Sequence, residues 1–574
     1  MEILDWVVLA STLIFIVLYG VYKTQGSKNV EEYIRGGNSS KWWTVGLSVM
    51  ATQASAITFL STTGQGFYSG MGFVQFYFGL PIAMVIICLV FIPIYHKLKV
   101  YTAYEYLEGR FDLKTRSLAA ILFLIQRSLA AGITIYAPAI ILSAVLGWDL
   151  TVLNIVIGLI VILYTVSGGT KAVSVTQKQQ MAIIFIGMFI AFFLILDYLP
   201  DEVSFTDALS IAGAGEKMNL LDFSFDLNNR YTVWTGILGG TFLMLSYFGT
   251  DQSQVQRYLS GKNVREMRLG LIFNGLLKIP MQFFILLVGV MVFVFYQFNA
   301  TPANFNPIAT QAVQNSEYSG EYKSLEINLA RNLRYRKAAA FNLAKDPSKD
   351  VYVVDGKEYS WLDKFNKEDK VLRTQAKELI TKADSKVETN DKDYVFIHFI
   401  LNNLPRGLIG LLLAVILSAA MSSTASELNA LGATTAIDLY KRNVGEKDDA
   451  HYVKATKGFT LLWGLLAIVV ACTASLFENL IELVNIIGSV FYGNILGIFL
   501  LAFFFKYVKG NAVFISALIT QVIICVFYGL IHFGMIEFPY LWLNVIGSAL
   551  VIGIAFLLQT AMPSKPNSNV QSTI

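Results

Sequence analysis

The chain has 574 residues, of which 55% are hydrophobic and only 15% are charged. Soluble domains carry about 25% charged residues, so this composition excludes an ordinary soluble globular protein. The formal net charge of +4 is too small to indicate a nucleic-acid partner. Cys88, Cys472 and Cys525 lie in separate apolar runs without CxxC pairing, which argues against a disulfide framework or a zinc site.

The first apolar run covers residues 6–22. A signal peptide would need a basic start and a small-residue cleavage site, whereas this chain begins MEILD and Lys23 and Lys28 follow the run. We therefore expect a retained first transmembrane helix.

A membrane-spanning helix needs about 20 mostly apolar residues to cross ~30 Å of hydrocarbon. Thirteen segments meet this requirement, which predicts an all-α polytopic membrane protein with about thirteen transmembrane helices. In chain order they cover residues 5–23, 41–67, 72–96, 117–147, 150–167, 178–199, 231–256, 268–297, 405–440, 455–475, 479–506, 511–533 and 538–560.

The short loops between these segments alternate in charge. One set is basic, as at Lys97 and Lys99, and the other is neutral or acidic, as at Asp201 and Glu202 or the single Glu478. Cytoplasmic loops carry the excess of Lys and Arg, so we expect the N-terminus outside and the C-terminus inside.

One long polar segment, residues 300–393, falls on the outer side in this topology. Within it, residues 324–343 are predicted to form an amphipathic helix. A small folded cap is the preferred interpretation of this segment, ahead of a specific role in ligand binding.

Two of the long segments contain clusters of small and hydroxylated residues at mid-membrane depth, at 49–58 and 418–426. Backbone groups in hydrocarbon must be satisfied internally, so interrupted helices mark cavities and binding sites. We expect both segments to be interrupted, although the same composition also suits a tight helix–helix contact. Freed carbonyls and hydroxyls together would suit sodium, a hard cation that prefers oxygen ligands.

Six motifs in this order resemble the sodium/solute symporters, the family of sodium-coupled sugar, proline, sialic acid, monocarboxylate and iodide carriers. The resemblance covers nearly the whole chain except 300–393, and it implies a LeuT-type fold with two five-helix inverted repeats after a leading helix. The motifs are SVMATQASAITFL (48–60), YEYLEGRF (104–111), SGGTKAV (167–173), DQSQVQRYLSGK (251–262), AAMSSTAS (419–426) and GSVFYGNILGIFLLAFFFK (488–506).

The resemblance also implies a division of the chain into segments. These are a leading helix and cytoplasmic loop (1–40), the first inverted repeat (41–199), the start of the second (200–299), an extracellular insertion (300–393), the rest of the second repeat (394–506), C-terminal helices (507–562) and a cytoplasmic tail (563–574).

Family members hold one sodium ion between the broken first helix of the first repeat and the eighth core helix. Carried over by position, the implied ligands are the carbonyl oxygens of Ala51, Ala54 and Ala419 and the hydroxyls of Ser422 and Ser423. These positions coincide with the two stretches selected above on physical grounds.

Some members have a second sodium site that uses an aspartate where this chain has Gln177. Of its hydroxyl positions Ser426 is kept, whereas another is Ala425. Since an amide cannot supply the charge, we predict one sodium ion per cycle.

The candidate substrate site is implied by the sodium/galactose members. Their substrate tyrosine and lysine match Tyr247 and Lys278, but Thr58 and Tyr77 stand where they have a glutamine and a glutamate. With Gln53 these residues are the candidate substrate ligands. Tyr247 as a core aromatic, and Lys278 as a snorkelling or gate lysine, stay open as alternatives.

Two further ionisable residues, Arg127 and Glu427, are expected within the membrane, where charges are expensive and mark function by default. Arg127 could bind a substrate carboxylate through its planar fork. Pairing of Arg127 with Glu427 or another acid, as a cytoplasmic gate that includes Tyr247, is preferred, because Glu427 would otherwise lack a partner. A third possibility is that Glu427 supplies the charge that Gln177 lacks.

The expected function is a sodium-coupled symporter of the plasma (inner) membrane that imports a small organic solute by alternating access. The solute is a sugar, a polyol or a small carboxylate, with inorganic anions still open, and no obligatory protein partner is implied. A proton-coupled carrier is the alternative, although the implied ion ligands contain no titratable group. A channel would show a filter loop, and an enzyme or receptor would need a catalytic constellation or a signalling domain, none of which the sequence contains.

Overall fold

The computed structural model describes residues 2–24, 29–226, 229–385, 387–473 and 480–562. Within these ranges nine helices are long and apolar enough to cross a membrane, and three shorter apolar helices accompany them. Every predicted span overlaps one of these helices, whereas the number of spans and their orientation stay predictions. The predicted tail at 563–574 and Glu478 lie outside the described residues.

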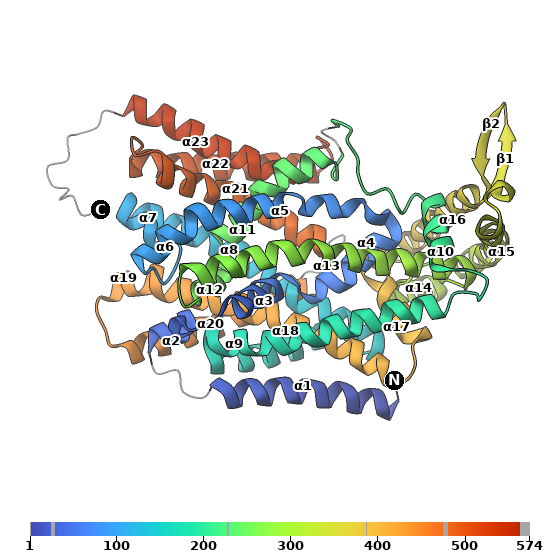
Figure 1. Cartoon of the computed structure of the whole chain (residues 1–574), viewed down its shortest axis with the longest axis horizontal. Helices are drawn as coiled ribbons and strands as arrows, with labels where there is room; N and C mark the ends of the chain where they lie inside the picture. Colours follow the sequence, from blue (N-terminus) through green and yellow to red (C-terminus); the bar gives the residue numbers. More distant parts are fainter. Residues whose placement is uncertain (1, 25–28, 227–228, 386, 474–479, 563–574) are drawn as a thin grey trace.

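The first half of the bundle runs from α1 to α13 (Figure 1). Its apolar helices are joined by short helices at the bundle ends, so the chain turns back within a few residues. In order they are α1 (Ile3–Thr24), α2 (Val30–Arg35), α3 (Trp42–Gln53), α4 (Ala56–Ser69), α5 (Gly79–Ile86), α6 (Ile92–Leu98), α7 (Glu105–Arg110), α8 (Leu113–Leu146), α9 (Leu150–Asp197), α10 (Phe205–Ala214), α11 (Gly240–Gly249), α12 (Gln252–Leu259) and α13 (Val264–Phe298).

The second half follows a polar insertion and ends in the helices at the top of Figure 1. Its helices are α17 (Val395–Asn403), α18 (Leu408–Thr434), α19 (Lys441–Val444), α20 (Asp449–Thr473), α21 (Leu480–Phe504), α22 (Gly510–His532) and α23 (Trp542–Ala561).

Burial separates a central helix from peripheral ones. All residues from 412 to 434 of α18 are buried, so this helix forms the centre of the bundle. In contrast, α22 exposes Leu518, Val522 and Val526 at helical spacing. An apolar outer stripe of this kind suits contact with lipid rather than water.

The two hydroxyl-rich segments differ. The chain is interrupted between α3 and α4, as expected, but α18 runs without a break through 418–426, so the expected second interruption is wrong. The reason is local: the Ser423 hydroxyl donates to the Ala419 carbonyl at 2.8 Å, and the Ser426 hydroxyl donates to the Ser422 carbonyl at 3.1 Å. These hydroxyls are satisfied within the helix, which therefore needs no interruption.

A second difference concerns residues 168–177, which were predicted to be a loop between two spans. The structure continues α9 through them and bends it at Gly169, where φ is +58°. A β-carbon there would lie 2.7 Å from the ring of Tyr33 and 2.8 Å from its carbonyl, so only glycine permits this approach.

The insertion is a folded unit of its own. It comprises α14 (Pro307–Gln314), α15 (Ser319–Lys345), a hairpin of β1 (Val351–Val354) and β2 (Lys357–Ser360), and α16 (Trp361–Ala383). The predicted helix at 324–343 lies inside α15. Leu329 and Leu379 belong to a small apolar core that α15 and α16 share. The Asp355-Gly356 turn has φ of 50° and 74°, as a two-residue hairpin requires.

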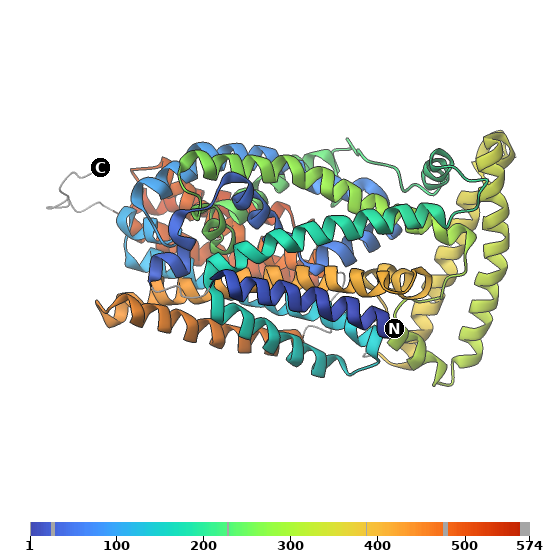
Figure 2. The same ribbon diagram turned by 60° about the horizontal axis from the view of Figure 1, so that its bottom comes forward.

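Figure 2 shows α15 and α16 standing across one end of the bundle, the end at which α1 begins. α23 ends at the opposite end (Figure 1). The insertion therefore lies across the end of the bundle opposite to the end of α23.

Candidate functional site

The interruption between α3 and α4 redirects two backbone hydrogen bonds. The Ser55 N–H donates to the Gln53 carbonyl at 3.1 Å rather than to Ala51, four residues back. The Thr58 N–H likewise donates to the Ser55 carbonyl at 3.0 Å rather than to Ala54. Because the helical donors are diverted, the carbonyl oxygens of Ala51 and Ala54 become available to another partner.

The hydroxyl pair of α18 lies beside this interruption. The Ser422 hydroxyl is 3.5 Å from the Ala51 carbonyl oxygen, which joins the two helices directly. Ser423 lies on the next position and contacts the Ala419 carbonyl at 2.8 Å. All five implied sodium ligands are buried, and the structure thus brings Ala51 and Ser422 together.

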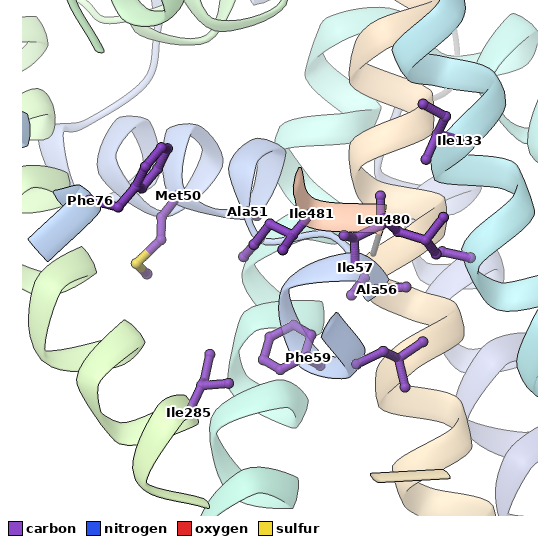
Figure 3. Close-up of a cluster of buried hydrophobic side chains, with 14 of the residues drawn as sticks. Met50, Ala51, Ala56, Ile57, Phe59, Phe76, Ile133, Ile285, Leu480 and Ile481 are labelled. Atoms are coloured by element: carbon purple, nitrogen blue, oxygen red, sulfur yellow. The ribbon is translucent and has the colours of Figure 1, made fainter. Parts of the chain in front are cut away.

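Apolar side chains surround the interruption. Figure 3 shows Ala51, Ile57, Ile133 of α8, Ile285 of α13 and Ile481 of α21 around the start of α4. An apolar surround excludes water and strengthens any electrostatic contact made inside it. Apolar side chains therefore flank the freed carbonyl groups, and polar residues such as Gln53 and Thr58 lie at the same interruption.

A central cavity of about 80 Å³ opens next to the interruption. Its wall combines residues of α3, α4, α8, α11, α18 and α21, so residues far apart in the sequence meet there. Seven of the predicted site residues line it: Gln53, Thr58, Tyr77, Arg127, Tyr247, Ser423 and Glu427.

Arg127 is the charged centre of one side of this cavity. Its guanidinium contacts Glu427 at 3.0 Å, the Tyr492 hydroxyl at 2.5 Å and the Asp251 carboxylate. Tyr492 in turn donates to Asp251 at 2.9 Å, and the Tyr247 ring lies 5.4 Å from the guanidinium carbon. Arg127 is thus paired with Glu427 and with a second acid, and the bonded nitrogens are committed to the protein in this conformation.

Asp251 and Tyr492 were not selected from the sequence, although both lie in quoted motifs. Asp251 falls inside the predicted span 231–256. An ionisable residue at membrane depth is the signal that singled out Arg127 and Glu427. Applied to every predicted span, that signal would have found Asp251. Nothing in the sequence marks Tyr492, since tyrosine is common among membrane aromatics.

Gln177 lies in a buried network of hydroxyl groups. Its amide nitrogen donates to Thr52 at 3.2 Å and to Ser426 at 3.0 Å. Its amide oxygen accepts from Ser48 at 2.5 Å, and Ser48 also contacts Ser174 at 3.1 Å. The amide therefore links α3, α9 and α18 through neutral hydrogen bonds.

Among the predicted substrate ligands, Lys278 is the residue that does not line the central cavity. Its side chain is fully buried on α13, and its ammonium has no hydrogen-bond partner among the described residues. One turn along, the Gln282 amide donates to Tyr77 at 2.5 Å, and Tyr77 lines the cavity. Lys278 thus lies near the cavity wall without forming it.

Comparison with known proteins places this arrangement among transporters. The chain is 28% identical over 518 residues to the sodium-coupled monocarboxylate transporter 1 of Xenopus laevis, covering 90% of this chain and 70% of the relative. It is 33% identical over 275 residues to the human sodium/iodide cotransporter, which covers 47% of this chain and 42% of that relative. With the sodium/sialic acid symporter of Proteus mirabilis it shares 31% identity over 314 residues, which cover 53% of this chain and 61% of that relative.

Among solved structures, the chain shares the fold of a substrate-bound, outward-open Na⁺-coupled sialic acid symporter, with a TM-score of 0.72, 22% identity and 98% of each chain covered. The model of the sodium:solute symporter family matches residues 33–333 and 377–520, well over half of the chain. The chain therefore belongs to the sodium:solute symporter family, which consists of sodium-coupled transporters and not of enzymes.

Proposed function

We propose that this protein is a sodium-coupled symporter of the plasma membrane that imports a small carboxylate-bearing anion, with one sodium ion per cycle. The observation that supports this proposal most directly is the freed Ala51 carbonyl oxygen of α3, which lies 3.5 Å from the Ser422 hydroxyl of α18. The fold proposed with it is the LeuT type, with thirteen spans, the N-terminus outside and the C-terminus inside.

The sodium site would be formed by the carbonyls of Ala51, Ala54 and Ala419 and by the hydroxyls of Ser422 and Ser423. All five ligands are neutral oxygens of the kind that hard cations prefer. An ion held there would tie the interruption between α3 and α4 to the centre of the bundle at α18. Since the ligands carry no charge, release of the ion is not opposed by a carboxylate.

A single sodium ion is supported by the Gln177 network. A second cation next to Ser426 would meet two N–H donors of the amide instead of a carboxylate. A donor facing a cation is repulsive, so this position favours the neutral hydrogen-bonded state.

A small anion is supported by the size of the central cavity and by the relatives. The central cavity has a volume of about 80 Å³, far below the ~300–1,000 Å³ of pockets for drug-sized ligands. The relatives are named for a monocarboxylate, iodide and sialic acid, each of which is an anion or an acid. Gln53, Thr58, Tyr77 and Tyr247 would contact the solute through amide and hydroxyl groups.

Arg127 and Glu427 would form the inner gate, together with Asp251 and Tyr247. The ring of Tyr247 lies over the guanidinium, so opening toward the cytoplasm requires both to move. Sodium and solute bound in the outward-open form would favour closure above them, and the bundle would then rearrange to release both inside.

Uptake of L-lactate into proteoliposomes tests this function, with sodium, lithium and proton gradients compared. We expect uptake with sodium only. Ser423→Ala should raise the sodium concentration for half-maximal uptake roughly tenfold, about 1.4 kcal/mol. Ser418→Ala on the same helix is the matched control, and equal sodium affinity in both variants would refute the assignment of Ser423.

The number of sodium ions per cycle is tested separately. One sodium ion and one monocarboxylate carry no net charge, so an imposed membrane potential should leave lactate accumulation unchanged. A second sodium ion would add ~2.3 kcal/mol of driving force per 100 mV. Accumulation that rises with an inside-negative potential would contradict a single sodium ion.

A further inference from the structure

The insertion and the bundle enclose a second, larger cavity, here called the vestibule. It has a volume of about 410 Å³ and lies between α16 on one side and the ends of α4 and α13 on the other. Tyr68 of α4 lines it, whereas Thr58 of the same helix lines the central cavity. Ten residues of helix separate the two, so the two cavities lie about 15 Å apart along α4.

The vestibule has a basic wall. Six of its lining residues are Lys or Arg and three are Asp or Glu. Two of the cations, Arg336 and Arg373, share the carboxylate of Asp369, at 3.1 and 2.8 Å. One carboxylate cannot neutralise two guanidinium groups, so this cluster keeps an excess positive charge.

Two further lysines of the wall have no carboxylate within ion-pair distance in the described part of the chain. The ammonium of Lys217 donates to the Tyr68 carbonyl at 2.6 Å, and Lys370 is exposed toward the cavity. Burial, and to a lesser degree the nearby Lys370, lowers the pKa of Lys217 to about 8. Glu216 beside Lys217 offsets part of this charge, but neither lysine has a direct ion pair in the described residues, and two lysines near one another favour a bound anion.

The basic wall belongs to the insertion more than to the part of the chain that matches the family. Residues 334–376 lie outside the match to the family, and they include Arg336, Lys370 and Arg373. The insertion is fixed on the bundle by Asp391, whose carboxylate accepts from the Tyr68 hydroxyl at 2.9 Å and contacts Lys377 at 3.0 Å. The vestibule is thus a built feature with a defined position over α4.

We infer that the vestibule is a binding site for a small carboxylate-bearing anion, held between the insertion and the outer end of α4 before it enters the central cavity. The inference rests on the proposed function, because it assigns the same solute class to a second position. A cleft lined by one sign of charge raises the local concentration of counter-ions and their rate of entry.

Charge variants at Lys370 test the site in proteoliposomes with a constant sodium gradient. At low ionic strength we expect Lys370→Gln to raise the KM for L-lactate roughly threefold and Lys370→Glu roughly tenfold, with kcat unchanged. Added choline chloride should abolish the difference, since the screening length falls to about 3 Å at 1 M salt. Lys382→Glu, an exposed lysine of the same helix outside the vestibule, is the matched control.

A second measurement does not depend on transport. Acetylation of surface lysines, followed by peptide mass spectrometry, should be slowed at Lys370 by L-lactate and not by the neutral lactamide. Equal protection by both, or equal KM shifts in Lys370→Glu and Lys382→Glu, would overturn the site. Absence of sodium-dependent lactate uptake by the unaltered protein would instead refute the proposed function, and protection of Lys370 would still report on the vestibule.

Discussion

Two buried cations of the bundle, Arg127 and Lys278, have opposite surroundings. Arg127 contacts two carboxylates and a tyrosine hydroxyl, whereas the ammonium of Lys278 has no partner in the described residues. Both lie in helices that cross the apolar region, where an unpaired charge is costly. Arg127 is thus paired with side chains of the protein itself in this conformation.

The surroundings of Lys278 point to a partner that this conformation does not supply. Asn274, one turn before it, has two amide atoms without partners among the described residues, and Gln282, one turn after it, has one. The three side chains follow the i, i+4, i+8 spacing and therefore share one face of α13. A face of this kind would be satisfied by water or solute when the bundle rearranges.

The largest effect is expected from Arg127→Gln. It leaves Asp251 and Glu427 buried without their cation, which costs about 3–5 kcal/mol when one partner of a buried pair is removed. We expect a marked fall in the unfolding temperature in detergent and loss of uptake. The double variant Arg127→Gln/Asp251→Asn should recover much of the stability, and an equally unstable double variant would show that the ion pairs are not the cause.

Lys278→Met should act in the other direction on stability. Removing a buried amine that has no partner in the described residues is expected to stabilise the protein by about 1–3 kcal/mol. Lactate uptake should fall at the same time if Lys278 meets solute during the cycle, as the candidate substrate site requires. A lower unfolding temperature would mean that Lys278 has a partner, and unchanged uptake would remove it from the transport path.

Glu427→Gln should destabilise the protein less than Arg127→Gln, because Arg127 keeps Asp251. We expect a loss of about 1–2 kcal/mol, seen as a small shift in the unfolding temperature. A loss as large as that of Arg127→Gln would show that Glu427, not Asp251, is the main counter-ion.

Tyr492→Phe is expected to have the smallest effect. It removes one hydroxyl that accepts from Arg127 and donates to Asp251, worth about 1 kcal/mol for a buried hydrogen bond. The ring still packs beside Tyr247, so stability should change little while the inner gate opens more readily. Faster sodium-driven uptake than in the unaltered protein is the expected readout, and slower uptake would contradict the proposal that the contacts of Arg127 hold the inner gate closed.

Much of the fold could be predicted from the sequence, because an apolar run of sufficient length has few alternatives to a helix. The interruption near Ala54 was also predictable from small and hydroxylated residues. The same signal was misleading at 418–426, since serine hydroxyls can return to the carbonyl four residues back and leave a helix intact. Composition alone does not distinguish these two outcomes.

The site was predictable only in part. Pairing of Arg127 with Glu427 followed from the cost of an unpaired buried charge, and the structure shows this contact. The position of Lys278 outside the cavity wall did not follow, because sequence separation fixes its helix but not the direction of its side chain. The vestibule could not be predicted either, since it forms only where the folded insertion meets α4 and α13.

The bond between Tyr68 and Asp391 fastens the insertion to the helix that follows the interruption. Nearby, a β-carbon at Gly64 would lie 1.9 Å from the Lys392 carbonyl oxygen, so the two backbones are in direct contact. Any reorientation of α4 must therefore either move α15 and α16 with it or break these contacts. A fluorescent dye attached to the far end of the insertion would then report a reorientation of α4.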